Sequence, residues 1–391
     1  MNSTTSSTPV SPQVTDYLEY KAAMVLWRVF SPGLIVTGTL GNVMSIAVLT
    51  RKSMRQSTVS LYLVVLAVVD ILVLYTGLLR QWLRVLQGTD LRNLHPLLCK
   101  VHVWMVYFSL DFSSWLLVAV TLERFVSVWF PHSVKRMCTR TTAGVIIAGI
   151  ATFLLAVNSH FLYGLGDVVY RSGNSTSIQH CASLWSGYET FANTIWPWID
   201  LCLFCLLPFL FLITGNVAII VKVCISNRKR RRHDANIGLS NTQNIKVRSS
   251  KTSSMTVMLL TTNAVFLVCT SPISIFLIGE VYWFDYATLQ PRGEAMYLLT
   301  WATVNVFMYT NNSINFLLYC ISGSRFREAL RGLFSRRRRI HPTASFTRND
   351  NSMLQPTASQ QAPERQEAEV TKKQVNLAVV GQDPRTDMSD I

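Results

Sequence analysis

The chain has 391 residues, of which 50% are hydrophobic and only 15% charged. This balance excludes an ordinary soluble protein of this size and is typical of a helical membrane protein. The net charge of +15 would suit a nucleic-acid-binding protein, but the basic residues lie in short runs between apolar stretches, and this distribution argues against that class. Membrane spans are therefore the first feature to seek.

Seven apolar runs are long enough to cross a bilayer, which takes about 20 residues of helix. They lie near residues 25–50, 57–83, 97–129, 141–164, 193–225, 253–280 and 294–320. The sequence therefore predicts an all-α membrane protein with a bundle of seven transmembrane helices over residues 25–320. Residues 1–24 are polar and lack the features of a cleavable signal peptide, so we expect the first span to direct the chain to the membrane.

Basic residues in the connections orient the bundle, because they collect on the cytoplasmic side. The connections on one side hold 22 Lys and Arg, whereas those on the other hold seven against eight Asp and Glu. This predicts an extracellular N-terminus, residues 1–24. Glycosylation signals at Asn2 and Asn174 fall on the predicted outer side. Of the eight cysteines only Cys99 and Cys181 fall there, in the oxidising compartment, which predicts a disulfide between them.

Two further segments follow the bundle. Residues 321–335 predict an amphipathic helix on the inner leaflet, with arginines on one side and apolar residues on the other, namely Phe326, Leu330, Leu333 and Phe334. Residues 336–391 are rich in Gln, Ser, Thr, Pro and charge, which is typical of a disordered tail. We expect this tail to be cytoplasmic.

Polar groups at membrane depth lie on the first, second and seventh spans. Asn42 and Asp70 each need polar partners there, and the seventh span supplies several amides. We therefore expect some of these amides to join Asp70 and Asn42 in one cluster. Two interpretations stay open, a cluster that only fixes helix packing and a buried carboxylate that binds a cation.

The third span joins the predicted disulfide to a charged pair. Cys99 and Arg124 are 25 residues apart, which is about 37 Å of helix. The Glu123-Arg124 pair is predicted to face the cytoplasm, because it is costly in lipid. Between these ends, Asp111 either contacts a ligand or is a core carboxylate bonded to a neighbouring helix. A bridge to Cys181 would draw the next outer loop across the bundle as a lid.

Prolines at mid-membrane depth, Pro208 and Pro272, predict bends in the fifth and sixth spans. Two bent helices suit a bundle that opens by swinging one end. Bends that only shape the packing are the alternative.

Together these features resemble the rhodopsin-like family of G-protein-coupled receptors, over about residues 25–335. The matching residues are Gly41-Asn42, Leu66-Ala67 with Asp70, Cys99 with Cys181, Glu123-Arg124, Pro131, Pro208, Pro272, Asn315 and Tyr319. The resemblance implies a receptor that converts extracellular ligand binding into activation of a heterotrimeric G protein. It implies no enzymatic activity and no cofactor, and the sequence shows no metal-spaced His/Cys cluster or nucleophile constellation.

The resemblance also implies roles for individual residues. Arg124 would be held by Glu123 at rest and released to engage the G protein, in a switch that includes Thr270, Pro272, Asn315 and Tyr319. A sodium pocket, with Na⁺ at Asp70, would be lined by Asp70, Ser113, Asn312 and Asn315 and bordered by Asn42.

The sequence departs from the family pattern at several switch positions. Thr270 stands where a tryptophan is usual, Asn216 stands where a tyrosine is usual, and Phe316 replaces the proline after Asn315. No acid near Lys251-Thr252 can lock Arg124 to the sixth helix. We therefore expect the switch geometry to differ from the family's.

Features of the outer ends narrow the ligand class. Val106 stands where amine receptors of the family place an aspartate, and residues 294–320 hold no lysine for a retinal Schiff base. Aromatic residues interleaved with both charge signs suit a short peptide, although each aromatic alone is as well explained by the membrane belt. The predicted ligand pocket contains Trp104, Tyr107, Asp111, Trp198, Asp200, Glu280, Trp283, Tyr297 and Trp301.

Finer resemblance is to invertebrate neuropeptide receptors of the FMRFamide-receptor type, in the inner loop 134–139, in Thr270-Ser271-Pro272 and in the Asn-Phe-Leu-Leu-Tyr sequence of the seventh span. We expect an amidated peptide whose arginine lies near Glu280 or Asp200. A lipid or non-amine small molecule is the alternative ligand, and a membrane transporter is the alternative class. Expected partners are the peptide, a G protein, arrestin and receptor kinases on the tail, and membrane lipids, but no nucleic acid. The expected location is the plasma membrane.

Overall fold

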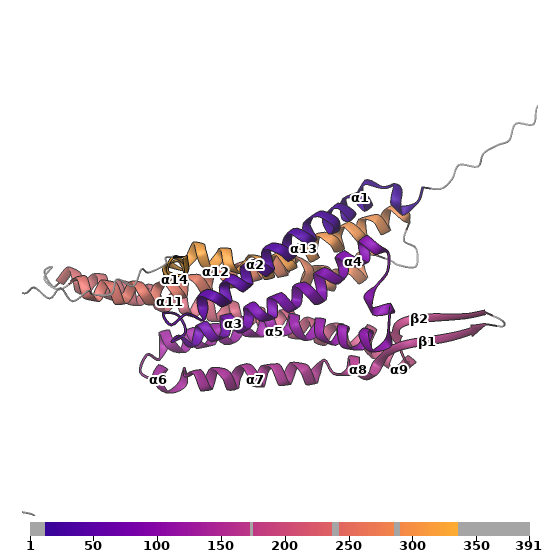
Figure 1. The fold of residues 1–391 in the computed structure, drawn as a ribbon. Helices are drawn as coiled ribbons and strands as arrows, with labels where there is room; N and C mark the ends of the chain where they lie inside the picture. Colours follow the sequence, from indigo (N-terminus) through magenta and orange to yellow (C-terminus); the bar gives the residue numbers. More distant parts are fainter. Residues whose placement is uncertain (1–11, 173–174, 237–241, 285–289, 335–391) are drawn as a thin grey trace, which may run out of the picture. The chain divides into compact units, whose positions relative to one another are not determined.

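The structure is a computed structural model that describes residues 12–172, 175–236, 242–284 and 290–334 (Figure 1). The predicted glycosylation sites Asn2 and Asn174 and the predicted tail, 336–391, lie outside the described residues.

Six of the described helical segments are long and apolar enough to cross a membrane. Three of them join helices through turns of π-helix, and the bounds of their parts are α1 (Leu18–Val25), η2 (Leu26–Phe30) and α2 (Ser31–Leu49); α3 (Thr58–Val73), η3 (Leu74–Leu78) and α4 (Leu79–Gln87); and α9 (Ser186–Thr190), η5 (Phe191–Ile195), α10 (Trp196–Leu201), η6 (Cys202–Leu206) and α11 (Leu207–Asn236). The others are α5 (Pro96–Trp129), α7 (Arg140–Val157) with α8 (His160–Gly164), and α12 (Thr242–Trp283).

A seventh long helix, α13 (Pro291–Ser322), completes the predicted bundle. It has 32 residues but is less apolar than the other six, because its inner half is rich in asparagine. It packs against α12, α2 and α1, so these amides face protein rather than lipid. We call the segments the first to seventh membrane helices in chain order.

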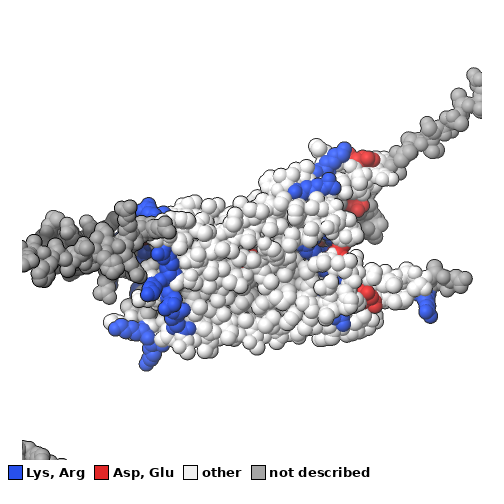
Figure 2. Space-filling view, viewed as in Figure 1, with Lys and Arg blue, Asp and Glu red and all other residues white. Residues whose placement is uncertain are grey.

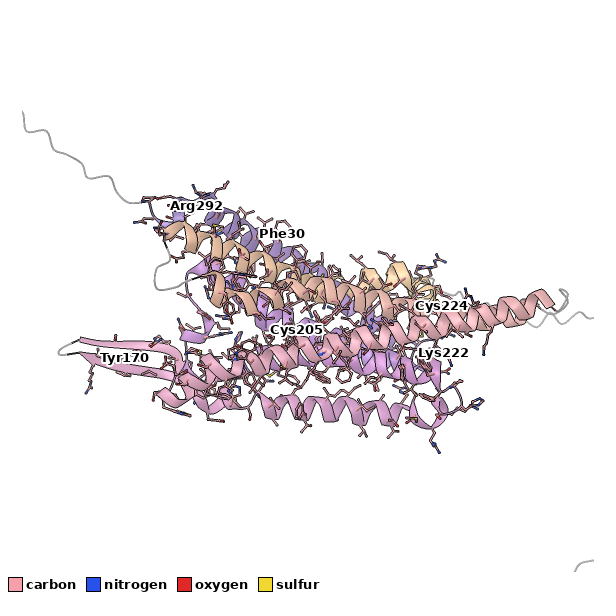
Figure 3. The ribbon with its side chains drawn as sticks, turned by 180° about the vertical axis from the view of Figure 1, so that it is seen from behind. Phe30, Tyr170, Cys205, Lys222, Cys224 and Arg292 are labelled. Carbon is pink, nitrogen blue, oxygen red and sulfur yellow. A yellow bond between two sulfur atoms is a disulfide. The ribbon has the colours of Figure 1, made fainter. Side chains whose placement is uncertain are left out.

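Short elements precede, connect or follow these helices. They are η1 (Val14–Asp16), η4 (Leu91–Asn93), α6 (Val134–Met137) and α14 (Ser324–Phe334). We call the end of the bundle with α6 and α14 the inner end, and the opposite end the outer end. In Figure 3, Lys222 and Cys224 mark the inner end, whereas Phe30, Tyr170 and Arg292 lie toward the outer end.

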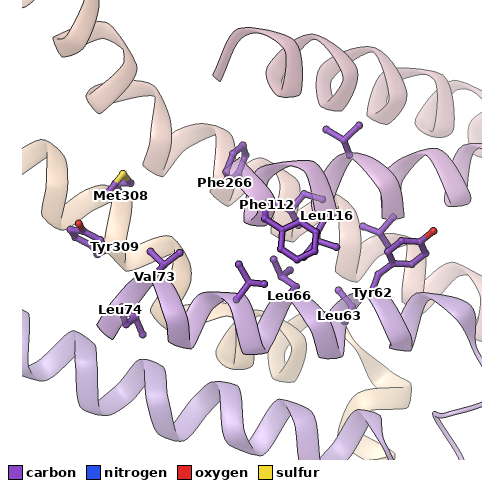
Figure 4. Close-up of a cluster of buried hydrophobic side chains, with 14 of the residues drawn as sticks. Tyr62, Leu63, Leu66, Val73, Leu74, Phe112, Leu116, Phe266, Met308 and Tyr309 are labelled. Atoms are coloured by element: carbon purple, nitrogen blue, oxygen red, sulfur yellow. The ribbon is translucent and has the colours of Figure 1, made fainter. Parts of the chain in front are cut away.

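Apolar side chains fill the middle of the bundle. Figure 4 shows Leu63 and Leu66 of α3 beside Phe112 and Leu116 of α5, and all four are buried. Lipid tails are as apolar as leucine, so close packing between helices, rather than escape from water, stabilises such a core. The third membrane helix has the largest buried share among the six apolar helices, 67%, which places it at the centre.

A hairpin covers part of the outer end. Strands β1 (Leu165–Ser172) and β2 (Ser175–Ser183) pair antiparallel, with an irregularity between Gly166 and Val168. Cys181 forms the predicted disulfide with Cys99, with their Cα atoms 5.4 Å apart. The hairpin projects outward from the bundle (Figure 1). It lines none of the outer cavities described below, so the expected lid does not take that form.

Charge separates the two ends. On the face shown in Figure 2, blue Lys and Arg atoms gather at the inner end, and both signs occur at the outer end beyond a broad white belt. Helix α14 coincides with most of the predicted amphipathic segment, but Phe326 and Ala329 are buried against the bundle. Part of its apolar face therefore packs against protein, and the exposed Leu333 and Phe334 are left for the membrane surface.

Candidate functional site

A cavity of about 380 Å³ lies at the outer end among the membrane helices. Its walls are aromatic and apolar, with polar and charged groups between them. The lining residues that matter below are Trp27, Gly77, Arg80, Gln81, Arg84, Arg92, Tyr107, Asp200, Trp301, Asn305 and Tyr309. We call it the outer cavity. A concave site with a few placed polar groups is the usual form of a ligand pocket.

A neighbouring cavity of about 430 Å³ shares Tyr107 and Asp200 with the outer cavity. It opens between the fifth and sixth membrane helices, where Trp198 and Glu280 line it. Five of the nine predicted pocket residues thus line one cavity or the other: Tyr107, Trp198, Asp200, Glu280 and Trp301.

The other four predicted pocket residues lie elsewhere. The indole N–H of Trp104 donates to the carbonyl of Leu155, at 3.0 Å, on the fourth membrane helix. Asp111 is buried and accepts a 3.0 Å bond from the amide of Asn158, which fits the core-carboxylate interpretation. Tyr297 packs against other rings, including that of Phe284 at 5.2 Å. Trp283 is 57% exposed beside Gly279 and lines neither cavity.

The structure adds charged residues to the pocket that the prediction omitted. Arg80, Arg84 and Arg92 all line the outer cavity, whereas Asp200 is the single acid that lines it in the part of the chain that the structure describes. Arg80 bonds both carboxylate oxygens of Asp90. Burial raises the pKa of Asp90. The bonds from Arg80 and from the backbone N–H of Arg92 outweigh that effect, and the pKa falls below its usual value, to about 2. The sequence does hold one indication of these residues: three arginines lie in or near one outer loop, whereas basic residues usually collect on the inner side.

A buried polar cluster lies below the outer cavity. One oxygen of Asp70 accepts bonds from Asn312, at 2.7 Å, and from Ser113, at 3.1 Å. The other accepts a 2.7 Å bond from Asn315. Asn42 donates to the backbone carbonyl of Asn312 at 2.9 Å. All five residues of the predicted sodium pocket are therefore gathered at one place.

The inner half differs from the expected switch. No ion pair forms between Glu123 and Arg124 among the described residues; Glu123 instead accepts a bond from Thr58 on α3. A guanidinium nitrogen of Arg124 lies 3.9 Å from the sulfur of Met255 on α12. Neighbouring residues on a helix point in different directions, so Glu123 reaches another helix more readily than it reaches Arg124.

Three residues, of which only Asn216 is named among the switch positions above, join the third, fifth and sixth membrane helices. The side-chain amide of Asn263 donates to the hydroxyl of Thr121, at 2.8 Å, and to the amide oxygen of Asn216, at 2.9 Å. We call Thr121, Asn216 and Asn263 the amide clasp. Asn216 stands where the family usually has a tyrosine. Its bond with Asn263 joins the fifth and sixth membrane helices.

The remaining switch residues are closely packed. Tyr319 is buried and its ring lies 5.5 Å from that of Phe326 on α14. Phe316 contacts the same ring at 5.8 Å and approaches α2 at Gly41, where an added Cβ would lie 3.0 Å from the Phe316 Cβ. Thr270 is also buried, two residues before Pro272 on α12. These contacts connect the end of α13 with α14 and α2.

Comparison with known proteins agrees with this arrangement. The family model described as 7 transmembrane receptor (rhodopsin family) matches residues 41–319. The FMRFamide receptor of Drosophila melanogaster is 26% identical over 334 residues, which cover 82% of this chain. The thyrotropin-releasing hormone receptors of Mus musculus and Homo sapiens are each 25% identical, and each alignment covers 84% of this chain.

The alignments differ in how much of each relative they include. The matched segment covers 57% of the fly receptor, so this chain spans little more than half of that protein, whereas it covers 83% and 82% of the mouse and human receptors. The family match extends over most of the chain, from the inner part of the first membrane helix through most of α13. The chain therefore belongs to the rhodopsin family of seven-transmembrane receptors, which are multi-pass membrane signalling proteins rather than enzymes.

Proposed function

We propose that this chain is a receptor for a short amidated neuropeptide and that it activates a heterotrimeric G protein when the peptide binds. The observation that carries the proposal is the outer cavity, which combines aromatic walls with charges of both signs. Peptides present both kinds of group, whereas a neutral lipid would leave the cavity's charged groups without partners. The names of the similar fly and mammalian receptors support a peptide ligand.

The seventh membrane helix offers a direct connection between ligand and polar cluster. Trp301 and Asn305 line the outer cavity, and Asn312 bonds Asp70 on the same helix. Asn305 and Asn312 are seven residues apart, about 10 Å along α13. A ligand that moves the outer part of α13 would therefore change the bonds at Asp70.

The polar cluster is a fitting place for Na⁺. The oxygens of Asn42, Ser45 and Asn315 are buried without a hydrogen-bond partner among the described residues. Carboxylate, hydroxyl and amide oxygens are the ligands that hard cations prefer. We propose that Asp70 and Ser113, with nearby amide oxygens, hold Na⁺, which would compensate the buried carboxylate charge and favour the resting arrangement.

The inner end supplies the contact with the G protein in this proposal. The amide clasp holds α12 against the third and fifth membrane helices at rest. Opening it would let α12 swing away and expose Arg124, whose guanidinium approaches Met255 at rest. Receptor kinases and arrestin would act on the tail, at the plasma membrane, with the N-terminus outside.

The proposal is tested by calcium and cyclic-nucleotide signalling in cells that express the chain, screened against short amidated neuropeptides. The expected result is a response to one peptide class that is lost in Arg124→Ala and kept in Arg55→Ala, an exposed inner arginine. Surface expression of every variant is measured in parallel. Transport of the peptide without any G-protein signal would contradict the receptor function.

A further inference from the structure

The outer cavity holds more positive charge than its own acids compensate. Among the described residues it is lined by three arginines and by one acid, Asp200. Asp90 neutralises Arg80 through bonds to both of its carboxylate oxygens. Arg84 and Arg92 remain, and both lie on the outer side, where basic residues are less frequent.

Arg92 is held in place with its donors available. Its Nε donates to Nδ1 of His102 at 3.3 Å, and its backbone N–H donates to Asp90 at 3.0 Å. Its terminal guanidinium nitrogens bond none of the described residues. Burial, followed by the charge of Arg80, lowers the pKa of Arg92 to about 10, so the group stays charged at neutral pH.

Arg84 adds a second cation at the rim. It is exposed, and its side chain has no hydrogen bond or ion pair among the described residues. Aromatic rings of Trp27, Tyr107 and Trp301 line the same cavity. A planar guanidinium pairs best with a carboxylate, through two parallel hydrogen bonds, and a partly buried cation without a partner is costly.

We propose that the outer cavity recognises an acidic group of its ligand, a side-chain carboxylate of Asp or Glu, through Arg92 and Arg84. This inference rests on the proposed peptide-receptor function and names the chemistry that the peptide carries. The carboxylate accepts hydrogen bonds from the terminal guanidinium nitrogens of Arg92. A neighbouring aromatic side chain of the peptide packs against Trp301 and Tyr107. An arginine of the same peptide remains free to approach Asp200.

Thermal unfolding of the purified full-length receptor tests this binding without knowledge of the natural ligand. The probes are N-acetyl-Asp-Phe amide and N-acetyl-Asn-Phe amide, which differ in one ionised group, at equal millimolar concentration. A ligand that binds the folded state raises the melting temperature, and we expect the Asp probe to raise it by at least about 2 °C more than the Asn probe.

Three variants give the controls. The double variant Arg84→Gln/Arg92→Gln is expected to remove the difference in melting temperature between the probes. Arg92→Lys keeps the charge but loses the planar pair of N–H donors, and it is expected to retain part of that difference. Arg171→Gln on the exposed hairpin leaves the difference unchanged. Equal shifts by the two probes, no shift by either, or a difference that survives in the double variant would overturn the proposal.

A paired screen separates this inference from the proposed function. Amidated peptides are tested beside their Asp→Asn or Glu→Gln counterparts, and non-peptide carboxylic acids are tested in the same cells. An active non-peptide acid that depends on Arg84 and Arg92 would support the acid site and contradict the peptide receptor. An active peptide without any acid, equally potent on the double variant, would support the receptor and overturn the acid site.

Discussion

The outer and inner halves of this receptor use polar groups in opposite ways. At the outer end, charged side chains line a cavity, and the guanidinium groups of Arg84 and Arg92 form no ion pair among the described residues. In the inner half, neutral side chains are paired across helices in the amide clasp. Charged groups without an ion-pair partner are suited to binding a charged ligand. Neutral hydrogen bonds are suited to holding helices that separate in the proposed activation.

The energies of the two kinds of interaction explain this division. A hydrogen bond to a charged group contributes about 1.5–3 kcal/mol, and one between neutral groups contributes about 0.5–1.5 kcal/mol. A buried ion pair also leaves a costly lone charge when it opens. A clasp of neutral amides can therefore hold the resting state while a modest binding energy at the outer end remains enough to open it.

Among single substitutions, the largest expected effect that would sharpen this comparison is at the clasp. Asn263→Leu removes two interhelical bonds, together about 2 kcal/mol, and should raise signalling without ligand by about 30-fold. Thr261→Val is the matched control, because its hydroxyl bonds only its own helix, at Val257. Basal cyclic-nucleotide or calcium signalling at equal surface expression measures both. Unchanged basal signalling in Asn263→Leu would show that the clasp does not restrain activation.

A somewhat smaller effect is expected for a single outer charge. If the active peptide contains arginine, Asp200→Asn should lower its potency by about tenfold, since one charge-assisted bond of about 1.5 kcal/mol is lost. Glu280→Gln, in the adjoining cavity, is the comparison that separates the two predicted arginine partners. Full concentration–response curves are required. Wild-type potency in both variants would remove the predicted arginine contact.

Sodium gives an intermediate test, because the polar cluster lies between the two halves. Replacing Na⁺ by N-methylglucamine should raise agonist affinity of the wild type by a few-fold, if Na⁺ stabilises the resting arrangement. Asp70→Asn should make agonist affinity independent of Na⁺. Competition binding in washed membranes measures this. Equal sodium dependence in wild type and variant would contradict a cation site at Asp70.

The smallest effect is expected at the hydrogen bond between Thr58 and Glu123. Thr58→Val removes one donor at the inner surface, and we expect basal signalling to rise by only about twofold, because Glu123 is half-buried and water can replace the lost donor. Thr50→Val is a suitable control, because the Thr50 hydroxyl bonds only carbonyls of its own helix. A change as large as that of Asn263→Leu would show that Thr58, rather than the clasp, dominates the restraint.

The fold was largely predictable because membrane spans follow from apolar length alone. The third predicted span, 97–129, differs from α5 by one residue at its start. The first two predicted spans end earlier or start later than the helices do, since helices continue into water beyond the apolar run. The contacts of Asp70 were also predictable in kind, because amides on an apolar helix must find polar partners.

Orientation around each helix explains what the sequence could not provide. Trp104 and Tyr297 are aromatic and near the outer end, as are Tyr107 and Trp301, yet only the latter two line the outer cavity. Composition does not tell which side of a helix meets a neighbour. Arg92 lies in a loop, where no periodicity predicts direction, so its approach to the cavity becomes visible only once η4 is folded beside α5.

Peptide-stimulated guanine-nucleotide exchange tests the central claim most directly. Membranes with the wild-type receptor, the Arg124→Ala variant and the Arg84→Gln/Arg92→Gln variant are mixed with purified G protein and the most active peptide of the screen. We expect fast exchange with the wild type, none with Arg124→Ala, and a peptide requirement about 100-fold higher for the double variant, since two charge-assisted contacts are lost. Exchange that ignores the peptide, or that persists in Arg124→Ala, would contradict a receptor that binds at the outer cavity and signals through Arg124.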